Sequence, residues 1–489
     1  MTNLFGVQDG GFYGDEGPIA ACATALAESA LALVRVSGRG CVDLISGCFS
    51  RPEALRGAAG NSVVYGWIVD GGRRIDEVLI NVYRAPKSYT GEDGMDISCH
   101  GGLAAGRAVL QTLYKHGFRP ALRGEFSFRS FLNGKIDLTR AEAVLEMVSA
   151  KSDKGLGRAV SRLSGVLEQE IRQINKLFLD SLTEIELLLD YSELDGVSAD
   201  DEALPGRAAV EAALSRLLRL ERSYRAEKLY RDGALAVIAG KPNAGKSSLF
   251  NLLLREERSI ISEIPGTTRD WIEGWISIEG IPVRLADTAG LRESEDALER
   301  LGMERSFGLL DEADLVILVL DGASGGDEVM AAAEDFMKAR KGASVLPVWN
   351  KADLAPPPHG VEHFCAANFC AANFCAANFC AANFCAISAK TGDGLNLLYE
   401  RIARILEKTA GTAAPDPAGP ALGSGRQKTL IDTAISCAEN ALAMHDEGLP
   451  ADLIAPSLRE AVNCLGEITG EVSSHDILES MFNRFCVGK

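Results

Sequence analysis

The spacing of apolar and polar positions divides the 489-residue chain into segments of different period. Residues 1–137 mix short apolar runs with turns. Val63 to Val69 and Glu77 to Tyr83 are predicted strands, and Leu103 to His116 is a predicted helix. We therefore expect residues 1–137 to form an α+β domain.

Helical periodicity takes over at Leu138. Predicted helices cover Ala141 to Ala150, Leu163 to Asp190 and Ala203 to Arg231, interrupted by an acidic, glycine-containing stretch from Asp190 to Asp201. Residues 138–232 are therefore expected to be the first part of a helical domain.

Short apolar runs return after residue 232. Ala234 to Ala239, Val283 to Ala286, Leu315 to Leu320 and Ala343 to Trp349 are predicted strands of a third region, 233–408. A linker rich in Pro, Gly and Ala follows at 409–426. The last region, 427–489, is helical again, with predicted helices at Gln427 to Ala443 and Ser457 to Phe485. Helices on both sides predict one helical domain interrupted by an inserted domain, an arrangement that proteins tolerate when the inserted termini lie close together.

A phosphate-binding pattern opens the inserted region. Gly240 to Ser248 fits G-x-x-x-x-G-K-[ST], after a predicted strand and before an apolar helical run, Leu249 to Leu254. Backbone N–H groups and a helix N-terminus converge on negative charge in such a loop. Lys246 is expected to reach the terminal phosphates, and Ser247 to hold Mg²⁺.

Two further motifs indicate that the base is guanine. Asn350-Lys351-Ala352-Asp353 follows a predicted strand, and the Asp353 carboxylate can accept hydrogen bonds from N1–H and the 2-amino group of guanine. Adenine lacks both donors and would leave the carboxylate unpaired, at a cost of about 1–3 kcal/mol or more. Ser388-Ala389-Lys390 lies downstream, where a backbone N–H could meet the base O6.

Two segments between these motifs are typical of nucleotide switches. Asp287-Thr288-Ala289-Gly290 is expected to hold the metal through water and to sense the γ-phosphate, and Gly266 to Asp270 supplies threonines for the Mg²⁺ shell. The glutamine that orients water in Ras-like enzymes is replaced by Leu291. The charged run that follows offers five replacements, or is a solvated helix face: Glu293, Glu295, Asp296, Glu299 and Arg300.

Composition limits the partners and the location. The formal charge of −18 argues against nonspecific binding of nucleic acid by the whole surface. The first 17 residues carry no basic residue, and the longest apolar strand run, Leu315 to Leu320, is far shorter than the ~20 residues of a membrane span. We expect a cytoplasmic protein without a membrane segment.

One predicted helix carries a basic row. It could contact RNA phosphates, or be a solvated face balanced by Glu211, Glu221 and Glu227, and the pattern favours the second interpretation. The row consists of Arg207, Arg216, Arg219, Arg222, Arg225, Lys228 and Arg231.

The twelve cysteines show no C-x-x-C pair and so no zinc signature. Five belong to a tandem F-C-A-A-N repeat within His363 to Ala386, whose period matches neither helix nor strand. We interpret the repeat as an expanded surface loop whose last copy leads into the strand before Ser388.

Motifs outside the inserted region give the chain a family resemblance. It resembles the MnmE (TrmE) family of tRNA modification GTPases over nearly its whole length. The motifs are Leu33 to Gly38 (LVRVSG), Ser88 to Asp93 (SYTGED), His100 to Gly102 (HGG), Gly124 to Ser127 (GEFS), Phe131 to Lys135 (FLNGK), Leu465 to Gly470 (LGEITG) and the terminal Phe485 to Lys489 (FCVGK).

The resemblance implies a multidomain protein, with a folate-binding N-terminal α+β domain and a helical domain interrupted by a Ras-like P-loop G domain. It also implies a K⁺-activated GTPase in which the cation stands where other enzymes place an arginine finger. Asn243, Ser262, Ile264 and Thr267 match the K⁺ ligands, Ser247 and Thr268 the Mg²⁺ ligands, and Glu299 the acidic residue that orients water.

The motifs and the resemblance together give a GTP-binding set: Asn243, Ala244, Gly245, Lys246, Ser247, Ser248, Ser262, Glu263, Ile264, Pro265, Gly266, Thr267, Thr268, Asp287, Thr288, Ala289, Gly290, Asn350, Lys351, Asp353, Ser388, Ala389 and Lys390.

The N-terminal region resembles a domain that binds a 5-formyltetrahydrofolate-type ligand and forms a homodimer. Arg35, Asp96, Lys135 and Lys489 match the folate positions, and Arg and Lys suit the carboxylates of a folate tail. The family usually has Glu at position 96. It also has a stretch rich in Pro, Gly and Arg where this chain has Thr24 to Ala30, so folate affinity or the dimer contact is expected to differ.

By resemblance, the protein modifies the wobble uridine (position 34) of certain tRNAs. It would do so in a heterotetramer with an FAD-binding partner of the MnmG (GidA) type, using a one-carbon unit from folate. Two alternatives remain open, an RNA-binding ribosome-assembly GTPase and a folate-binding regulatory GTP switch. The first would need an RNA-binding appendage such as a KH domain, whereas the C-terminal region here is predicted helical.

Overall fold

The computed structural model describes residues 17–195, 206–256, 273–287, 310–324, 329, 336, 344–357, 385–411, 418–472 and 475–489. The chain divides into two compact units. The first is Met1–Leu145 with Val462–Lys489, and the second is Glu146–Ala461.

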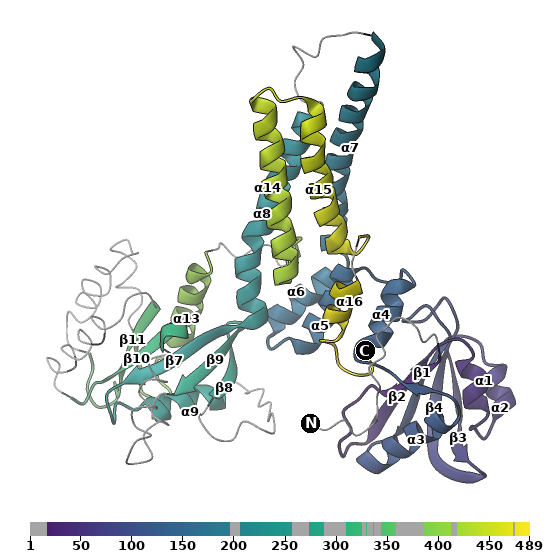
Figure 1. Cartoon of the computed structure of the whole chain (residues 1–489). Coiled ribbons are helices and arrows are strands. Elements are labelled where there is room, and N and C mark those ends of the chain that lie inside the picture. Colours follow the sequence, from purple (N-terminus) through teal and green to yellow (C-terminus); the bar gives the residue numbers. More distant parts are fainter. Residues whose placement is uncertain are drawn as a thin grey trace, which may run out of the picture. The chain divides into compact units, whose positions relative to one another are not determined.

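The first unit is built on a six-stranded sheet of order β3-β4-β5-β2-β1-β6 (Figure 1). Neighbouring strands are antiparallel except β1 and β6, which are parallel. Helix α3 (Leu103–Lys115) packs on one face of the sheet, because alternate strand residues such as Val34, Ile80 and Ile97 are fully buried. The strands are β1 (Ile19–Cys22), β2 (Leu31–Ser37), β3 (Ser62–Asp70), β4 (Arg73–Tyr83), β5 (Gly94–His100) and β6 (Arg119–Pro120).

Short helices complete the first unit. They are α1 (Cys41–Ser46), α2 (Pro52–Arg56), α4 (Glu125–Leu132) and α16 (His475–Phe482). Phe482 of α16 packs edge-on against Phe128 of α4, with ring centroids 5.3 Å apart. The terminal segment then forms a β-bridge between Val487 and Arg123. The C-terminal segment thus belongs to the same unit as the N-terminal sheet.

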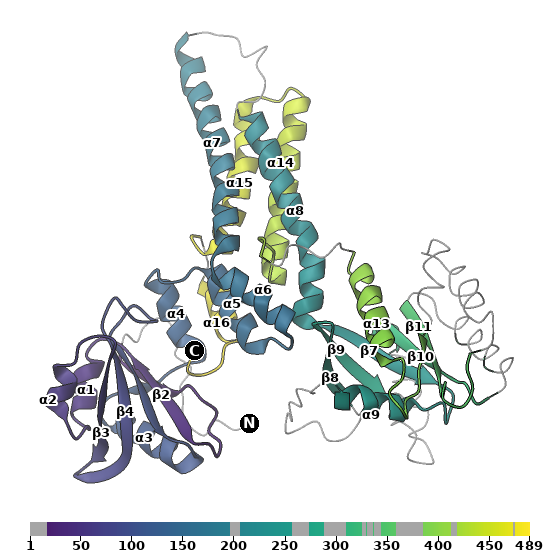
Figure 2. The ribbon, with the colours of Figure 1, turned by 180° about the vertical axis from the view of Figure 1, so that it is seen from behind.

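Helices before and after the G-domain sequence pack together in the second unit. Helix α8 contacts both α7 and α14 (Figure 2). Leu217 and Leu220 of α8 are buried, and Ser424 caps α14 by accepting a hydrogen bond from the Gln427 N–H. The helices of this part are α6 (Asp153–Leu163), α7 (Val166–Asp195), α8 (Arg207–Asp232) and α14 (Gly425–Asp446), while α5 (Leu138–Ser149) and α15 (Ala451–Thr469) each have residues in both units.

Several predicted helix limits were wrong. The segment from Leu163 to Asp190 begins three residues too early and ends five too early, since α7 runs from Val166 to Asp195 and Gly165, with φ 92°, separates it from α6. Helix α8 begins at Arg207 and not at the predicted Ala203. The segment from Ser457 to Phe485 is broken after α15, where Gly470 has φ 89°. Glycine takes this left-handed conformation without the steric cost of a Cβ, and so ends both helices.

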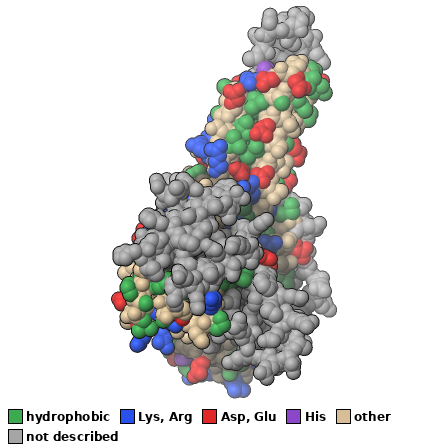
Figure 3. Space-filling view, turned by 90° about the vertical axis from the view of Figure 1, so that its left-hand side faces the viewer, with side chains coloured by type: hydrophobic (Ala, Val, Ile, Leu, Met, Phe, Trp, Pro, Cys, Tyr) green, Lys and Arg blue, Asp and Glu red, His purple; other side chains and the backbone are tan. Residues whose placement is uncertain are grey.

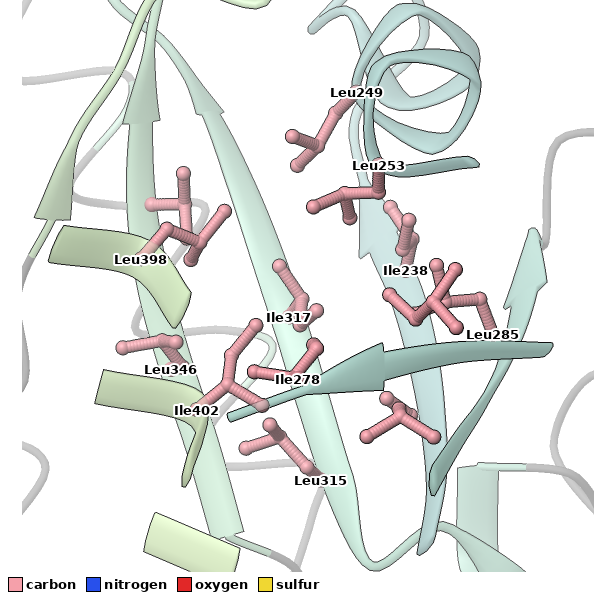
Figure 4. Close-up of a cluster of buried hydrophobic side chains, with 14 of the residues drawn as sticks. Ile238, Leu249, Leu253, Ile278, Leu285, Leu315, Ile317, Leu346, Leu398 and Ile402 are labelled. Carbon is pink, nitrogen blue, oxygen red and sulfur yellow. The ribbon is translucent and has the colours of Figure 1, made fainter. Parts of the chain in front are cut away.

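The G domain is a six-stranded sheet of order β12-β11-β10-β7-β9-β8, in which only β8 is antiparallel to its neighbour. The apolar residues of one face, among them Ile238, Leu285 and Ile317, pack with leucines of α9 and α13 (Figure 4). The elements are β7 (Ala234–Gly240), α9 (Lys246–Glu256), β8 (Glu273–Ile278), β9 (Ile281–Asp287), β10 (Leu315–Asp321), β11 (Ser344–Asn350), β12 (Cys385–Ala386) and α13 (Leu395–Thr409).

The last copy of the cysteine repeat leads into β12, as predicted, and Cys385 is buried there. The other four repeat cysteines lie outside the described residues. In the described parts of the chain, no helix combines the length and the apolar character needed to cross a membrane.

Candidate functional site

The phosphate-binding pattern forms a tight loop between β7 and α9. Asn243 and Gly245 have positive φ, 63° and 92°, and α9 begins at Lys246. A Cβ on Gly245 would lie 2.2 Å from the Asn350 Nδ2, so only glycine fits at this position. The first turn of α9 therefore points its N-terminus into the loop, where an anion is stabilised.

Two oxygen groups meet beside this loop. The Ser247 hydroxyl donates a hydrogen bond of 3.0 Å to Oδ2 of Asp287, which is 5% exposed. Strands β7 and β9 are parallel, and Ile238 pairs with Asp287, so the end of β9 lies level with the loop. A hydroxyl and a carboxylate are the oxygen donors that Mg²⁺ takes, usually with several waters.

Lys246 lies across the loop itself. Its Nζ donates to the carbonyl oxygen of Lys241 at 2.9 Å. This places the ammonium over the loop that would carry the phosphates.

Asn350 ties the predicted base-reading motif to the phosphate-binding pattern. Its side chain is 2% exposed, and its Nδ2 donates to the Ala244 carbonyl at 2.8 Å. Its Oδ1 accepts from the Ala389 backbone N–H at 3.0 Å. One amide thus fixes the phosphate loop and the 388–390 loop relative to each other. The sequence motif predicts that Asn350 belongs to the site but does not indicate this link.

Asp353 stands at the open edge of the same motif. Its Oδ1 accepts a hydrogen bond of 2.7 Å from the buried Ser388 hydroxyl, which also accepts from the Thr391 N–H. The Asp353 side chain is exposed. A carboxylate with one oxygen held in this way keeps acceptor positions for a base.

Lys351 is held by a residue that sequence analysis missed. Its Nζ lies 2.7 Å from Oδ2 of Asp321, at the end of β10. Burial alone would raise the pKa of Asp321, but the hydrogen bond and the charge of Lys351 lower it below its usual value. The position of Asp321 directly after a predicted strand, at the same sheet edge as the motif, was the signal that could have found it.

The structure brings the described part of the predicted GTP set together at the carboxyl ends of β7, β9, β11 and β12. The remaining predicted residues lie outside the described residues, and their roles stay predictions. They are Ser262, Glu263, Ile264, Pro265, Gly266, Thr267, Thr268, Thr288, Ala289, Gly290 and Glu299.

A second candidate site is a hollow of about 390 Å³ in the first unit. Its lining combines aromatic rings with charged groups, including Arg35, Tyr83, Tyr89, Asp96, Phe126 and Lys135. Aromatic walls with a few polar groups are typical of small-molecule sites.

Arg35 and Asp96 form a two-pronged pair in this hollow. Nε of Arg35 lies 2.9 Å from Oδ1 of Asp96, and Nη2 lies 3.3 Å from Oδ2. The two residues face each other across β2 and β5. Burial would lower the pKa of Arg35, but the hydrogen bond and charge of Asp96 raise it. Two hydrogen bonds to one carboxylate hold the Arg35 guanidinium in one orientation.

The two predicted lysines lie near this pair. Lys135 lines the hollow and donates from Nζ to the Pro86 carbonyl at 3.0 Å. Arg35 donates to the Gly488 carbonyl at 3.4 Å, which holds the chain terminus beside the hollow. Burial and the neighbouring charge of Arg35 lower the pKa of Lys489. The four predicted folate residues are thus drawn from four distant parts of the sequence.

Comparisons with known proteins cover both units. Residues 18–135 match the family described as the GTP-binding protein TrmE N-terminus, and residues 138–486 match the MnmE helical domain. The chain is 40% identical over 490 residues to the tRNA modification GTPase MnmE of Treponema denticola, covering 98% of this chain and 99% of that protein.

Two other relatives that are also described as tRNA modification GTPase MnmE match the chain over nearly its whole length. The protein of Borreliella burgdorferi is 38% identical over 483 residues, covering 98% of this chain and 99% of its own length. The protein of Carboxydothermus hydrogenoformans is 38% identical over 484 residues, covering 97% of this chain and 100% of its own length. Among solved structures, the G domain of the T. maritima FeoB iron transporter aligns over 35% of this chain and 98% of its own, with 24% identity and a TM-score of 0.25.

Proposed function

The chain belongs to the MnmE family of tRNA modification GTPases and is a GTP-hydrolysing enzyme, and from this premise we propose that its hydrolysis is activated by K⁺ and serves the wobble uridine. The product would be a 5-carboxymethylaminomethyl- or aminomethyl-type uridine at position 34 of certain tRNAs. We also propose cytoplasmic action, and domains at 1–137, 138–232 with 427–489, and 233–408, joined by the linker 409–426.

The observation that carries the nucleotide part is the linkage through Asn350. Its amide joins the 240–248 loop and the 388–390 loop at 2.8 and 3.0 Å, which supports one rigid frame for the phosphates and the base of a bound nucleotide. Positioning and electrostatic stabilisation supply almost all of the catalysis in phosphoryl transfer. Preorganisation of this frame therefore supports hydrolysis as well as binding.

The metal assignments complete the proposed mechanism. Ser247 and Thr268 would hold Mg²⁺, with Asp287 accepting from its water shell. Asn243, Ser262, Ile264 and Thr267 would hold K⁺. The two cations would supply the positive charge that the transferring phosphoryl group requires. Glu299 would orient the attacking water in place of the missing glutamine.

GTP turnover measured in K⁺ and in Na⁺ tests the cation. We expect much faster turnover in K⁺, and equal slow rates in the two salts would refute the K⁺ assignment. Glu299→Ala should abolish turnover while leaving GTP affinity nearly intact. Glu295→Ala, in the same charged run, is the matched control and should retain turnover. Loss of turnover in both variants, or in neither, would remove Glu299 from its role.

We assign the hollow of the first unit to a 5-formyltetrahydrofolate-type ligand that donates the one-carbon unit. The aromatic lining suits a flat pterin ring, and Lys135 of the lining and Lys489, whose neighbour Gly488 accepts a hydrogen bond from Arg35, suit the carboxylates of the tail. Calorimetric titration with 5-formyltetrahydrofolate should show weaker binding for Lys135→Ala than for the wild type. Lys115→Ala removes a lysine that pairs with Asp70 instead, and should bind normally.

A homodimer through the N-terminal domain is also part of the proposal. The sheet exposes large apolar side chains on one face: Leu31 is 64% exposed, Val63 60%, Tyr65 50% and Leu79 48%. Apolar patches of this kind mark protein interfaces. Sedimentation should show that Leu79→Arg shifts the wild-type dimer toward monomer. A monomeric wild type would contradict the dimer.

The modification itself is tested in cells. Mass spectrometry of tRNA nucleosides from a deletion strain should show loss of the modified wobble uridine, restored by the wild-type gene. Co-purification should recover an FAD-binding MnmG-type protein in a heterotetramer. Unchanged wobble nucleosides in the deletion strain would refute the proposed substrate.

A further inference from the structure

Helix α8 carries seven basic residues, and the structure divides them into two groups. Arg207, Arg216 and Arg231 each form ion pairs. Arg207 contacts Glu211 and Asp446, Arg216 contacts Glu170, and Arg231 contacts Asp232. Arg207 and Arg216 therefore link α8 to other helices of the bundle, and Arg231 neutralises a neighbouring carboxylate.

The second group contains three arginines that we call the α8 arginine row: Arg219, Arg222 and Arg225. All three side chains are exposed. Among the residues that the structure describes, no carboxylate forms an ion pair with any of them. Lys228 continues the row by one more exposed cation, and its charge acts on Asp232.

The acidic residues that the sequence offered as a balance are engaged elsewhere. Glu227 is 2% exposed and is bound by the buried Arg158 and Arg162. Glu221 is bound by Lys428, at 3.2 Å. Glu211 pairs with Arg207. The balanced face expected from the sequence is therefore not present at the α8 arginine row.

The row is regular and lies in an acidic protein. A spacing of three residues places consecutive Cα atoms about 4.5 Å apart along the helix axis. The whole chain carries a formal charge of −18, so this cluster of arginines is a local positive region on a protein of negative net charge. Figure 3 shows Lys and Arg side chains gathered in a group on the flank of the helical bundle.

The chemistry of the row favours a phosphate backbone over a protein partner. A guanidinium binds phosphate oxygens with two parallel hydrogen bonds. Protein interfaces have an apolar centre, whereas no described residue of α8 is an exposed large hydrophobic side chain. Nucleic-acid binding needs only the basic surface.

We infer that the α8 arginine row contacts the phosphate backbone of the tRNA on which this enzyme acts. This inference rests on the proposed function, which supplies the tRNA. Nothing in the nucleotide site or in the hollow of the first unit requires these arginines.

The test is tRNA binding by the full-length protein as a function of salt. Fluorescently labelled tRNA is titrated with the wild type and with a triple variant, Arg219→Gln, Arg222→Gln and Arg225→Gln. The matched control changes three other exposed arginines that have no ion pair among the described residues: Arg39→Gln, Arg107→Gln and Arg484→Gln. Both variants make the formal charge of −18 more negative by three.

Three phosphate contacts release counterions and contribute about 2 to 3 to the slope of log affinity against log salt. That contribution alone weakens binding about 20- to 40-fold between 50 and 200 mM salt. We expect the row variant to lose this part of the slope, and the control variant to keep it. Both variants should retain wild-type GTP turnover without tRNA.

Three outcomes would overturn the inference. The first is equal slopes and affinities for the row and control variants. The second is a wild type that does not bind tRNA. The third is a row variant that binds tRNA normally but loses the FAD-binding partner, which would assign the row to an acidic protein surface. The wobble-nucleoside measurement is independent of all three, so the proposed function can stand when this inference fails.

Discussion

Replacing Asp353 by asparagine should change the base that the G domain prefers. Guanine presents N1–H and a 2-amino group, both hydrogen-bond donors, to the carboxylate. An asparagine keeps one acceptor oxygen but turns an NH2 group toward the 2-amino group, so two donors face each other. Xanthine carries a carbonyl oxygen at that position and restores a donor–acceptor pair.

The structure indicates that this substitution spares the fold. Asp353 is exposed, and among the described residues its carboxylate accepts a hydrogen bond from the Ser388 hydroxyl at 2.7 Å. The asparagine oxygen can accept the same hydrogen bond. The effect should therefore fall on the nucleotide and not on the surrounding loops.

The magnitude follows from the lost charged hydrogen bond. Hydrogen bonds to charged groups contribute about 1.5–3 kcal/mol, and an unpaired group costs about 1–3 kcal/mol. A net loss of about 2–3 kcal/mol corresponds to roughly 30- to 150-fold weaker GTP binding. Xanthosine triphosphate should gain affinity by a comparable factor.

Competition of unlabelled GTP and xanthosine triphosphate against a fluorescent nucleotide measures both affinities. Asp393→Asn is the matched control, because it removes an exposed carboxylate from the neighbouring loop. It should leave the preference for GTP intact. If Asp353→Asn binds GTP within about twofold of the wild type, or gains nothing for the xanthine nucleotide, Asp353 does not read the base.

Three further predictions concern buried or paired groups. Asn350→Ala leaves two backbone groups without their partner, at about 1–3 kcal/mol each, so equilibrium titration should show greatly weakened nucleotide binding; near-normal affinity would refute the bridging role. Glu227→Gln leaves the buried charges of Arg158 and Arg162 without the carboxylate that compensates them, and urea unfolding should show a loss of about 3–5 kcal/mol in the free energy of unfolding. An unchanged midpoint would refute the buried network. The hydrogen bond to Asp76 and its charge raise the pKa of His100 above its ordinary 6.5, so the pair stabilises the fold below pH 6.5 and that stabilisation is lost as pH rises through the raised value. An NMR titration that gives His100 a pKa at or below 6.5 would contradict the interaction between His100 and Asp76.

The strands and the phosphate loop could be predicted because their signals are local. The apolar run from Ala234 to Ala239 became β7, and the run from Ala343 to Trp349 became β11. The loop geometry follows from glycine at fixed spacing. Helix limits were less certain, since the breaks at Gly165 and Gly470 lie inside longer stretches of helical pattern.

The candidate site was predicted as a set of residues, without its internal contacts. The sequence shows that Asn350 and Ala244 belong to motifs of one nucleotide site, but these residues are separated by 106 positions. No periodicity relates side chains at such a distance. Their hydrogen bond exists because parallel strands end at one edge of the sheet.

The sequence by itself determined the strongly patterned elements, such as α3, β7 and β11, and the residue types that occur at each motif, since these depend on interactions within a few residues. The tertiary structure alone decided which charges are neutralised. Glu227 is near Arg225 in sequence, yet it is buried with Arg158 and Arg162, 69 and 65 residues away. A charge pairs with its neighbour in space, where Coulomb attraction and burial act, and the fold chooses that neighbour.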